Sequence, residues 1–111
     1  MEEKILCAAI WYKNIPIQKK IKENTLPVNC DRGLVFCGHR HCHCMHTMTS
    51  VTGLRSVLSE VGEYIQGFLT NKNRFVDRQE AYKIAFEQDQ IIGPNKGYKT
   101  NAVGLTTEDL Y

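Results

Sequence analysis

The chain has 111 residues, of which 42% are hydrophobic and 23% are charged, and its formal net charge at pH 7 is only +2. These values are typical of a globular protein, and they predict one domain over residues 1–111 with one modest core. They exclude the strongly basic surface of a DNA- or RNA-binding domain, and no apolar run approaches the roughly 18 to 20 residues that span a membrane.

The cysteines and the N-terminus predict the compartment. Five cysteines is an odd number, and the first residues, MEEKILCAAIWYK, begin acidic and lack the apolar centre of a secretory signal. We therefore expect reduced thiols and a cytoplasmic location. A small core without disulfides is only marginally stable, so we also expect the chain to oligomerise and bury more apolar surface.

The first third of the chain predicts a set of strands. KILCAAIWY (4–12) is rich in β-branched and aromatic residues and predicts a strand. NIPIQKKI (14–21) alternates apolar and polar residues imperfectly, which indicates a returning strand with Pro16 on an edge. Segment 22–33 contains Asn, Pro, Asp and Gly and predicts a loop, and the apolar run LVFCG (34–38) predicts a central strand.

The apolar period then changes to that of a helix. From about Arg40, apolar residues at i, i+4 and i+7 predict a helix that ends at Gly53. A second helical pattern follows Gly53 and stops near Gly62. YIQGFLT (64–70) predicts another strand, and NKN (71–73) predicts a turn.

The clearest helix signal comes next. Asp77 is a natural N-cap, and Glu80 three residues later is expected to complete a capping box. Ala81, Ile84, Ala85 and Gln88 form one stripe of this helix, flanked by Tyr82 and Phe86. The helix is expected to end before IIGPNKG (91–97), and the apolar tail GLTTEDLY (104–111) to dock on its own fold or on a partner. Together these elements predict an α+β fold, a small, mostly antiparallel sheet with two or three helices on one face.

The stretch CGHRHCHCMH (37–46) holds three cysteines and four histidines. A structural zinc site is one reading, because Cys42 and His46 stand at i, i+4, as do His39 and His43 if the helix begins early. However, the spacings match no standard zinc finger, and residues 47–111 contain no His or Cys to complete a site. A catalytic Cys/His pair lacks a distinguishable base and orienting group.

The alternative reading of this stretch involves no metal. Cys42 or Cys44 then packs in the core with Met48 as a small, soft hydrophobic residue. Arg40 and His41 point outward from a strand-to-helix corner, and this surface meets a ligand or another subunit.

Arg74 and Arg78 form an unusual pair near the start of the predicted third helix. Arg78 follows the N-cap, where the helix dipole disfavours a cation, and Arg74 lies four residues earlier. With the free backbone N–H groups of the first turn, the pair is a candidate phosphate site. The alternative is that Arg78 pairs with a surface carboxylate such as Glu80 or Glu87.

A second basic corner supports a nucleotide ligand. Arg40 sits where a strand gives way to a helix, a geometry similar to that of Arg78. Aromatic residues accompany both corners in the sequence, namely Trp11, Tyr12, Phe68 and Phe75. There is no P-loop and no dinucleotide-binding glycine pattern, so the expected ligand is a nucleotide or another phosphate compound held in a different way.

Four blocks of the sequence, covering roughly half of the chain, resemble a family of small phage proteins. The blocks are ILCAAIWYK, GHRHCHCM, EYIQGFLTNKNRFVDRQEAYKIA and the C-terminal EDLY. They are similar to a family pattern of an N-terminal strand, G-x-RH-x-x-C, QGFLT-x-x-x-RFVDR-x-EA, and a tail ending near SEDLY or SEDLW. The family that these blocks resemble is that of the first-described phage Thoeris anti-defence proteins.

This resemblance implies a sponge and not an enzyme. Such proteins bind glycocyclic ADP-ribose, the signal made by the TIR-domain sensors of Thoeris, without cleaving it, so that the effector is never activated. Some members also bind cyclic oligonucleotides of another defence system, CBASS, at separate sites between subunits. The resemblance further implies dimers that assemble into hexamers, no cofactor, and a location in the cytoplasm of the infected bacterial host.

The resemblance also implies site residues. Arg74 and Arg78 match the arginine pair that contacts the phosphates of the signal, and the expected glycocyclic ADP-ribose site adds Asp77, Phe75 and Phe68. The expected cyclic oligonucleotide site consists of Gly38, Arg40 and His41.

The chain departs from the family pattern in two places. The ring that stacks on adenine is expected between the matching blocks, where His46, Met48 and Tyr64 are the candidates. The segment 14–33 before the G-x-RH block is longer than in the pattern. A small Cys/His metal-binding regulator and a protein-interaction inhibitor are the alternative functions.

Overall fold

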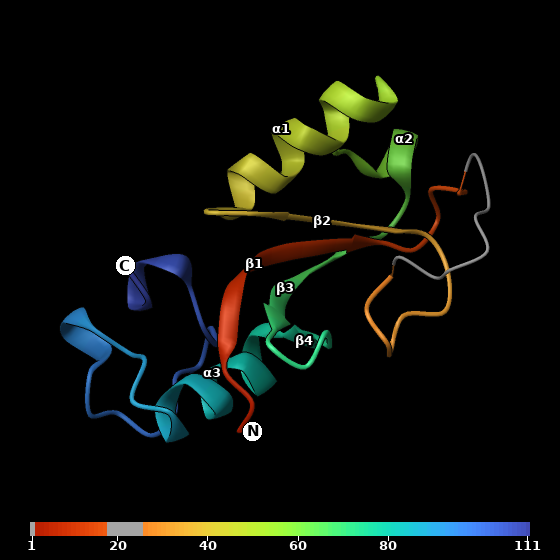
Figure 1. Ribbon diagram of the computed structural model, residues 1–111. Helices are drawn as coiled ribbons and strands as arrows, with labels where there is room; N and C mark the ends of the chain where they lie inside the picture. The colour runs from red at the N-terminus through yellow and green to blue at the C-terminus, as the bar shows by residue number, and fades with distance from the viewer. Residues whose placement is uncertain (1, 18–25) are drawn as a thin grey trace.

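The computed structural model describes residues 2–17 and 26–111 and confirms the α+β class (Figure 1). Its helices and strands are, in chain order, β1 (Ile5–Tyr12), β2 (Leu34–Gly38), α1 (His41–Thr52), α2 (Leu58–Val61), β3 (Ile65–Thr70), β4 (Phe75–Asp77) and α3 (Arg78–Glu87). Two 3-10 turns follow, η1 (Gly93–Asn95) and η2 (Thr107–Asp109). Within the described ranges, no helix is long and apolar enough to cross a membrane.

The four strands form an antiparallel sheet in the order β2-β1-β3-β4. The strands expected over 4–12, 34–38 and 64–70 are therefore confirmed, but the prediction that 34–38 is central is wrong. β1 is a central strand, and β2 lies at the edge of the sheet. The apolar run of β2 has another cause, because Leu34 and Phe36 pack on one core cluster while Val35 packs on the other.

Alternate residues of β1 face two different clusters, as expected for a strand. Ile10 and Tyr12 are fully buried in the larger cluster, which also includes Cys44 and Met48 of α1 and the buried side of α3. Each fully buried large side chain contributes about 1.5–3 kcal/mol, so this cluster is the main source of stability. The smaller cluster on the other face contains Ala9, Leu26, Cys30 and Phe75, with Trp11 packed against it.

The segment after β1 differs from its prediction. Residues 14–17 are not in a strand, because the chain turns at Lys13–Asn14 and Ile15 is then buried in the core, its N–H donating to the Tyr12 carbonyl. Residues 18–25, which include the rest of the expected strand, lie outside the described residues. The described part of the predicted loop, 26–33, consists of turns and bends.

The second predicted helix is also shorter than its apolar pattern suggested. Gly53 ends α1 in a left-handed conformation (φ +76°), as expected. The following residues form a bend because the Glu60 carboxylate accepts from both the backbone N–H and the guanidinium of Arg55. Only Leu58–Val61 is helical, and Gly62 (φ +70°) ends it.

The start of α3 confirms Asp77 as the N-cap, since its Oδ1 accepts from the Glu80 N–H at 2.8 Å. In the expected capping box the Glu80 side chain would accept from the Asp77 N–H. The Glu80 carboxylate instead accepts from Arg74 at 2.7 Å. The short strand β4 before this N-cap was not expected from the sequence. α3 ends at Glu87, before the predicted limit at 91–97.

The C-terminal tail docks on its own fold, one of the two predicted outcomes. Leu105 is fully buried, and the Ile92 N–H donates to the Asp109 carbonyl at 2.7 Å. Figure 1 shows the tail returning to lie beside the end of β2 and the start of α1. It thereby brings residues 105–111 next to the basic corner at Arg40.

Candidate anion-binding site

The site lies where the start of α1, the start of α3 and the tail meet. A cavity of about 290 Å³ opens there. It is lined by Arg40, His41, Cys42, Arg78, Thr106, Thr107 and Glu108. Two arginines that are 38 positions apart in the sequence therefore face one cavity.

The tail passes directly against Arg78. The Leu105 N–H donates to the Arg78 carbonyl at 2.8 Å, and Arg78 Nη1 donates back to the Leu105 carbonyl at 2.9 Å. Gly104 makes this approach possible, because a Cβ at this position would lie 2.6 Å from the Arg78 carbonyl carbon and its φ is +76°. The backbone of the tail thus fixes the Arg78 side chain at the wall of the cavity.

The hydrogen-bond partners of the Arg78 guanidinium among the described residues are all neutral. Besides the Leu105 carbonyl, it donates to Gln66 Oε1 at 2.7 Å and lies 3.4 Å from His41 Nδ1. Burial lowers the pKa of Arg78, and the nearby Glu108 charge opposes that effect. Among the described residues, three of the five N–H groups of this half-buried cation have these partners.

His41 holds Arg78 from the other side. Its Nε2 lies 2.8 Å from the Gly67 carbonyl, which can only accept, so Nε2 carries the proton. Nδ1 then has the free lone pair, and the donor-only guanidinium of Arg78 faces it. Burial lowers the pKa of His41, and the Arg78 charge acts in the same direction. The prediction that His41 points outward is therefore wrong.

Arg40 binds the end of the tail. Its Nη1 donates to Thr107 Oγ1 at 2.9 Å and lies 3.4 Å from the Glu108 carboxylate, while Nη2 donates to the Tyr111 carbonyl at 3.2 Å. The Tyr111 ring stacks on His39 with centroids 4.2 Å apart, and its hydroxyl donates to the His39 carbonyl at 2.7 Å. A stacked pair of rings therefore lies beside the cavity.

A family model described as "Phage T4 y16D protein" matches residues 4–111. The chain belongs to this phage T4 y16D family. No curated protein matches the chain, and no solved structure does either. The phage origin of this family agrees with the phage origin of the proteins that the sequence blocks resemble.

Arg74 does not share this cavity. Its Nε and Nη2 donate to the two Glu3 oxygens at 2.9 Å each, and Nη2 also donates to Glu80 at 2.7 Å. These bonds raise the pKa of Arg74, and the hydrogen bond from Arg74 lowers the pKa of Glu3 to about 2. The surface carboxylate expected to pair with Arg78 pairs instead with Arg74.

The other residues expected to form a site with Arg74 and Arg78 are not among the residues that line the cavity. Phe68 is fully buried beneath His41, with ring centroids 5.1 Å apart. Phe75 belongs to the cluster on the other face of the sheet, where it contacts Trp11 edge-on at 5.8 Å. Asp77 is occupied as the N-cap of α3.

The remaining site candidates lie apart from the cavity or beside it. Gly38 ends β2 directly under α1, where a Cβ would lie 3.1 Å from His43 Cβ. Among the residues considered for adenine stacking, Met48 is fully buried and Tyr64 packs on Tyr12 with centroids 5.1 Å apart. His46 is exposed on α1 but does not line the cavity. The His39–Tyr111 stack was not predicted from the sequence, although the terminal EDLY block and the apolar tail pointed to this end of the chain.

The side chains of the Cys/His stretch point in different directions. Cys44 is buried in the core, and Cys42 is exposed at the cavity. His43 Nδ1 accepts from the Arg40 N–H at 3.2 Å. In the described ranges, no group of three or more His, Cys, Asp or Glu side chains is arranged to hold a metal ion.

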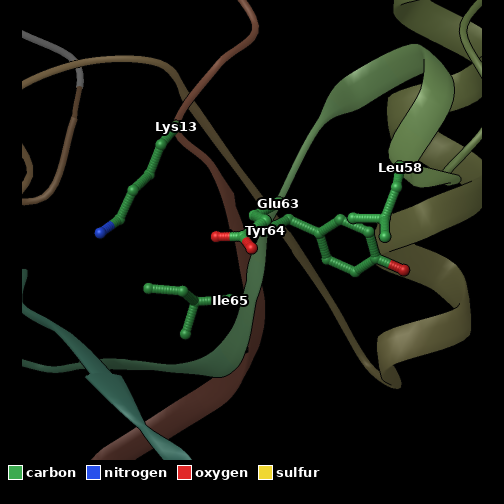
Figure 2. A pocket seen from close by; sticks show the side chains of 5 residues that line it. All are labelled: Lys13, Leu58, Glu63, Tyr64 and Ile65. Atoms are coloured by element: carbon green, nitrogen blue, oxygen red, sulfur yellow. The ribbon is translucent and has the colours of Figure 1, made fainter.

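A second, larger cavity of about 420 Å³ lies at the other end of β3 (Figure 2). Figure 2 shows Lys13 and Glu63 on one side of it and the Tyr64 ring beside Leu58 on the other. One cation and one carboxylate line it, whereas two arginines and one carboxylate, Glu108, line the first cavity. The first cavity is therefore the better candidate for a phosphate ligand.

Proposed function

We propose that this phage protein binds cyclic nucleotide immune signals, in the first place glycocyclic ADP-ribose, and sequesters them without cleavage. The observation that carries the proposal is the state of Arg78, a half-buried cation with neutral partners that faces a cavity with a second arginine. Desolvating a guanidinium costs free energy that an anionic ligand offsets. The family resemblance of the sequence supplies the identity of the signal.

The chemistry of the cavity suits a phosphate-containing nucleotide. Arg40 and Arg78 bind the phosphate oxygens, because their guanidinium groups are the charged donors that line the cavity. The Thr106 and Thr107 hydroxyls line the same wall and donate to Asp109 and Glu108. The stacked rings of His39 and Tyr111 offer a flat apolar surface for a base.

The size of the cavity supports a shared site. A volume of about 290 Å³ lies at the lower limit for small-molecule pockets, so a dinucleotide-sized signal extends beyond it. We propose that a second copy of the chain completes the pocket, in dimers that assemble further. Sequestration is stoichiometric, so nanomolar affinity, about 12 kcal/mol of binding free energy, is required.

The same cavity supports cyclic oligonucleotides as a second ligand class. Arg40 and His41 were expected to belong to that site, and both face the cavity that Arg78 faces. In this proposal one cavity therefore serves both ligands, in place of the separate sites that the resemblance implies. The proposed setting is the cytoplasm of the infected bacterium, where such signals are made and where an excess of binding protein prevents effector activation.

The test is a capture experiment. Protein is mixed with glycocyclic ADP-ribose, passed through a filter that retains protein, and the retained fraction is heated and analysed by chromatography. The proposal expects the ligand to disappear from the filtrate and to be released intact on heating. Ligand that stays in the filtrate contradicts the proposal, and recovery of a cleaved product shows an enzyme instead.

Matched variants connect this test to the cavity. Arg40→Ala combined with Arg78→Ala is expected to leave the ligand in the filtrate. Arg55→Ala removes an arginine that is also ion-paired but lies outside the cavity, so capture is expected to persist. Capture that survives the double substitution would move the site elsewhere on the protein.

A further inference from the structure

The anion cavity has one negatively charged wall. Among the described residues that line it, Glu108 is the only carboxylate. Its Oε2 lies 3.4 Å from Arg40 Nη1 and accepts from Thr107 Oγ1 at 3.0 Å. Burial lowers the pKa values of Arg78 and His41, and the Glu108 charge acts in the opposite direction on both. Glu108 is thus the counterion that these groups share.

The Glu108 side chain is held weakly. It is 74% exposed, and a separation of 3.4 Å is long for an ion pair with an arginine. Exposed pairs of this kind contribute little to stability, because water screens both charges. The side chain can therefore rotate into solvent at small cost.

The backbone beside Glu108 is held independently. Asp109 is 3% exposed, its Oδ1 accepts from Asn95 Nδ2 at 2.7 Å, and its carbonyl accepts from the Ile92 N–H at 2.7 Å. Leu105, on the other side, is fully buried. Rotation of the Glu108 side chain consequently leaves η2 and the wall of the cavity in place.

We propose that Glu108 is an internal counterion which occupies the position of a ligand phosphate beside Arg40 and is displaced when the ligand binds. With two arginines and one glutamate the cavity carries a formal charge of +1, and it carries +2 once the carboxylate has turned away. Glu108 therefore weakens the binding of every phosphate compound and excludes anions that bind the arginines less well than it does. This inference rests on the proposed function for its natural ligand, but it applies to any phosphate that enters the cavity.

The test compares Glu108→Gln with the wild-type protein by calorimetry at low salt, with inorganic pyrophosphate and glycocyclic ADP-ribose as separate probes. Glu108→Gln keeps the shape of the side chain and removes its charge, so we expect roughly two- to fivefold tighter binding of both probes. Glu60→Gln is the matched control, because Glu60 is also paired with an arginine but lies outside the cavity. Its affinities should equal those of the wild type.

The two probes separate this inference from the proposed function. Tighter pyrophosphate binding without any binding of glycocyclic ADP-ribose would support the counterion and remove the proposed function. Unchanged affinity in Glu108→Gln would overturn the counterion, as would weaker binding, which would show that the carboxylate contacts the ligand directly. If neither protein binds either probe, the inference and the proposed function both fail.

Discussion

Arg74 should be a stabilising residue, and its removal should destabilise the fold in a pH-dependent way. Its bidentate ion pair with Glu3 links the N-terminal segment to the β3–β4 turn. The hydrogen bond from Arg74 is the main cause that lowers the Glu3 pKa from 4.5 to about 2. A shift of this size corresponds to about 3 kcal/mol at 1.36 kcal/mol per pKa unit. Because water still reaches the pair, we expect about 1–2 kcal/mol for Arg74→Ala at pH 7.

The sign of the pH effect follows from the lowered pKa. A carboxyl whose pKa is lower in the folded protein stabilises the fold fully above its unfolded value of about 4.5 and loses that contribution as the pH falls toward 2. The difference in unfolding free energy between wild type and Arg74→Ala should therefore shrink between pH 5 and pH 2.

Urea unfolding at pH 7 and at pH 3 measures this difference directly. Glu3→Gln should cost a similar amount, and the double variant should cost much less than the sum of the two. Arg55→Ala, which breaks an exposed pair, is the control and should change little. A pH-independent cost, or additive costs of the two substitutions, would refute the assigned role of the Glu3–Arg74 pair.

Three further predictions concern the cavity. Gly104→Ala should lower the unfolding free energy by about 1–3 kcal/mol and weaken ligand binding. The added Cβ would clash with Arg78, and the backbone of residue 104 has a positive φ. Thermal unfolding measures the first effect and calorimetry the second. Tyr111→Ala should weaken nucleotide binding by about tenfold through loss of the ring stacked on His39, whereas Tyr111→Phe, which keeps the ring, should bind normally in the same titration. A saturating cyclic dinucleotide should displace glycocyclic ADP-ribose in competition dialysis, because one cavity serves both, and simultaneous binding of the two would contradict that arrangement.

The sequence predicted those parts of the fold that depend on local signals. β1 is rich in β-branched and aromatic residues, β3 contains Ile65, Phe68 and Thr70, and α1 and α3 have a helical period with a glycine end or an N-cap. Such signals act over a few residues, so they can be read without knowing the rest of the chain. The position of β2 in the sheet and the length of α2 depend instead on packing partners and on the Glu60–Arg55 contact, which the sequence does not reveal.

The grouping of the site residues could not be predicted for the same reason. Arg74 and Arg78 are four positions apart and were expected to act together, but a short strand and a helix start separate them and send their side chains to different partners. Arg78 is positioned by Leu105, 27 residues away, and Arg40 by Tyr111, 71 residues away. Contacts of this range arise only when the tail docks. The sequence did single out Arg40 and Arg78 from their places at two helix starts, and His41 through the family resemblance, and all three line the cavity.

Calorimetric titration of Arg78→Ala with glycocyclic ADP-ribose, beside the wild-type protein, tests the central claim most directly. Each charge-assisted hydrogen bond is worth about 1.5–3 kcal/mol, so losing one corresponds to an affinity lower by about 10- to 150-fold. We expect nanomolar binding by the wild type and a loss of affinity of at least that size in the variant, with the variant still folded by circular dichroism. Equal affinity of the two folded proteins would contradict it.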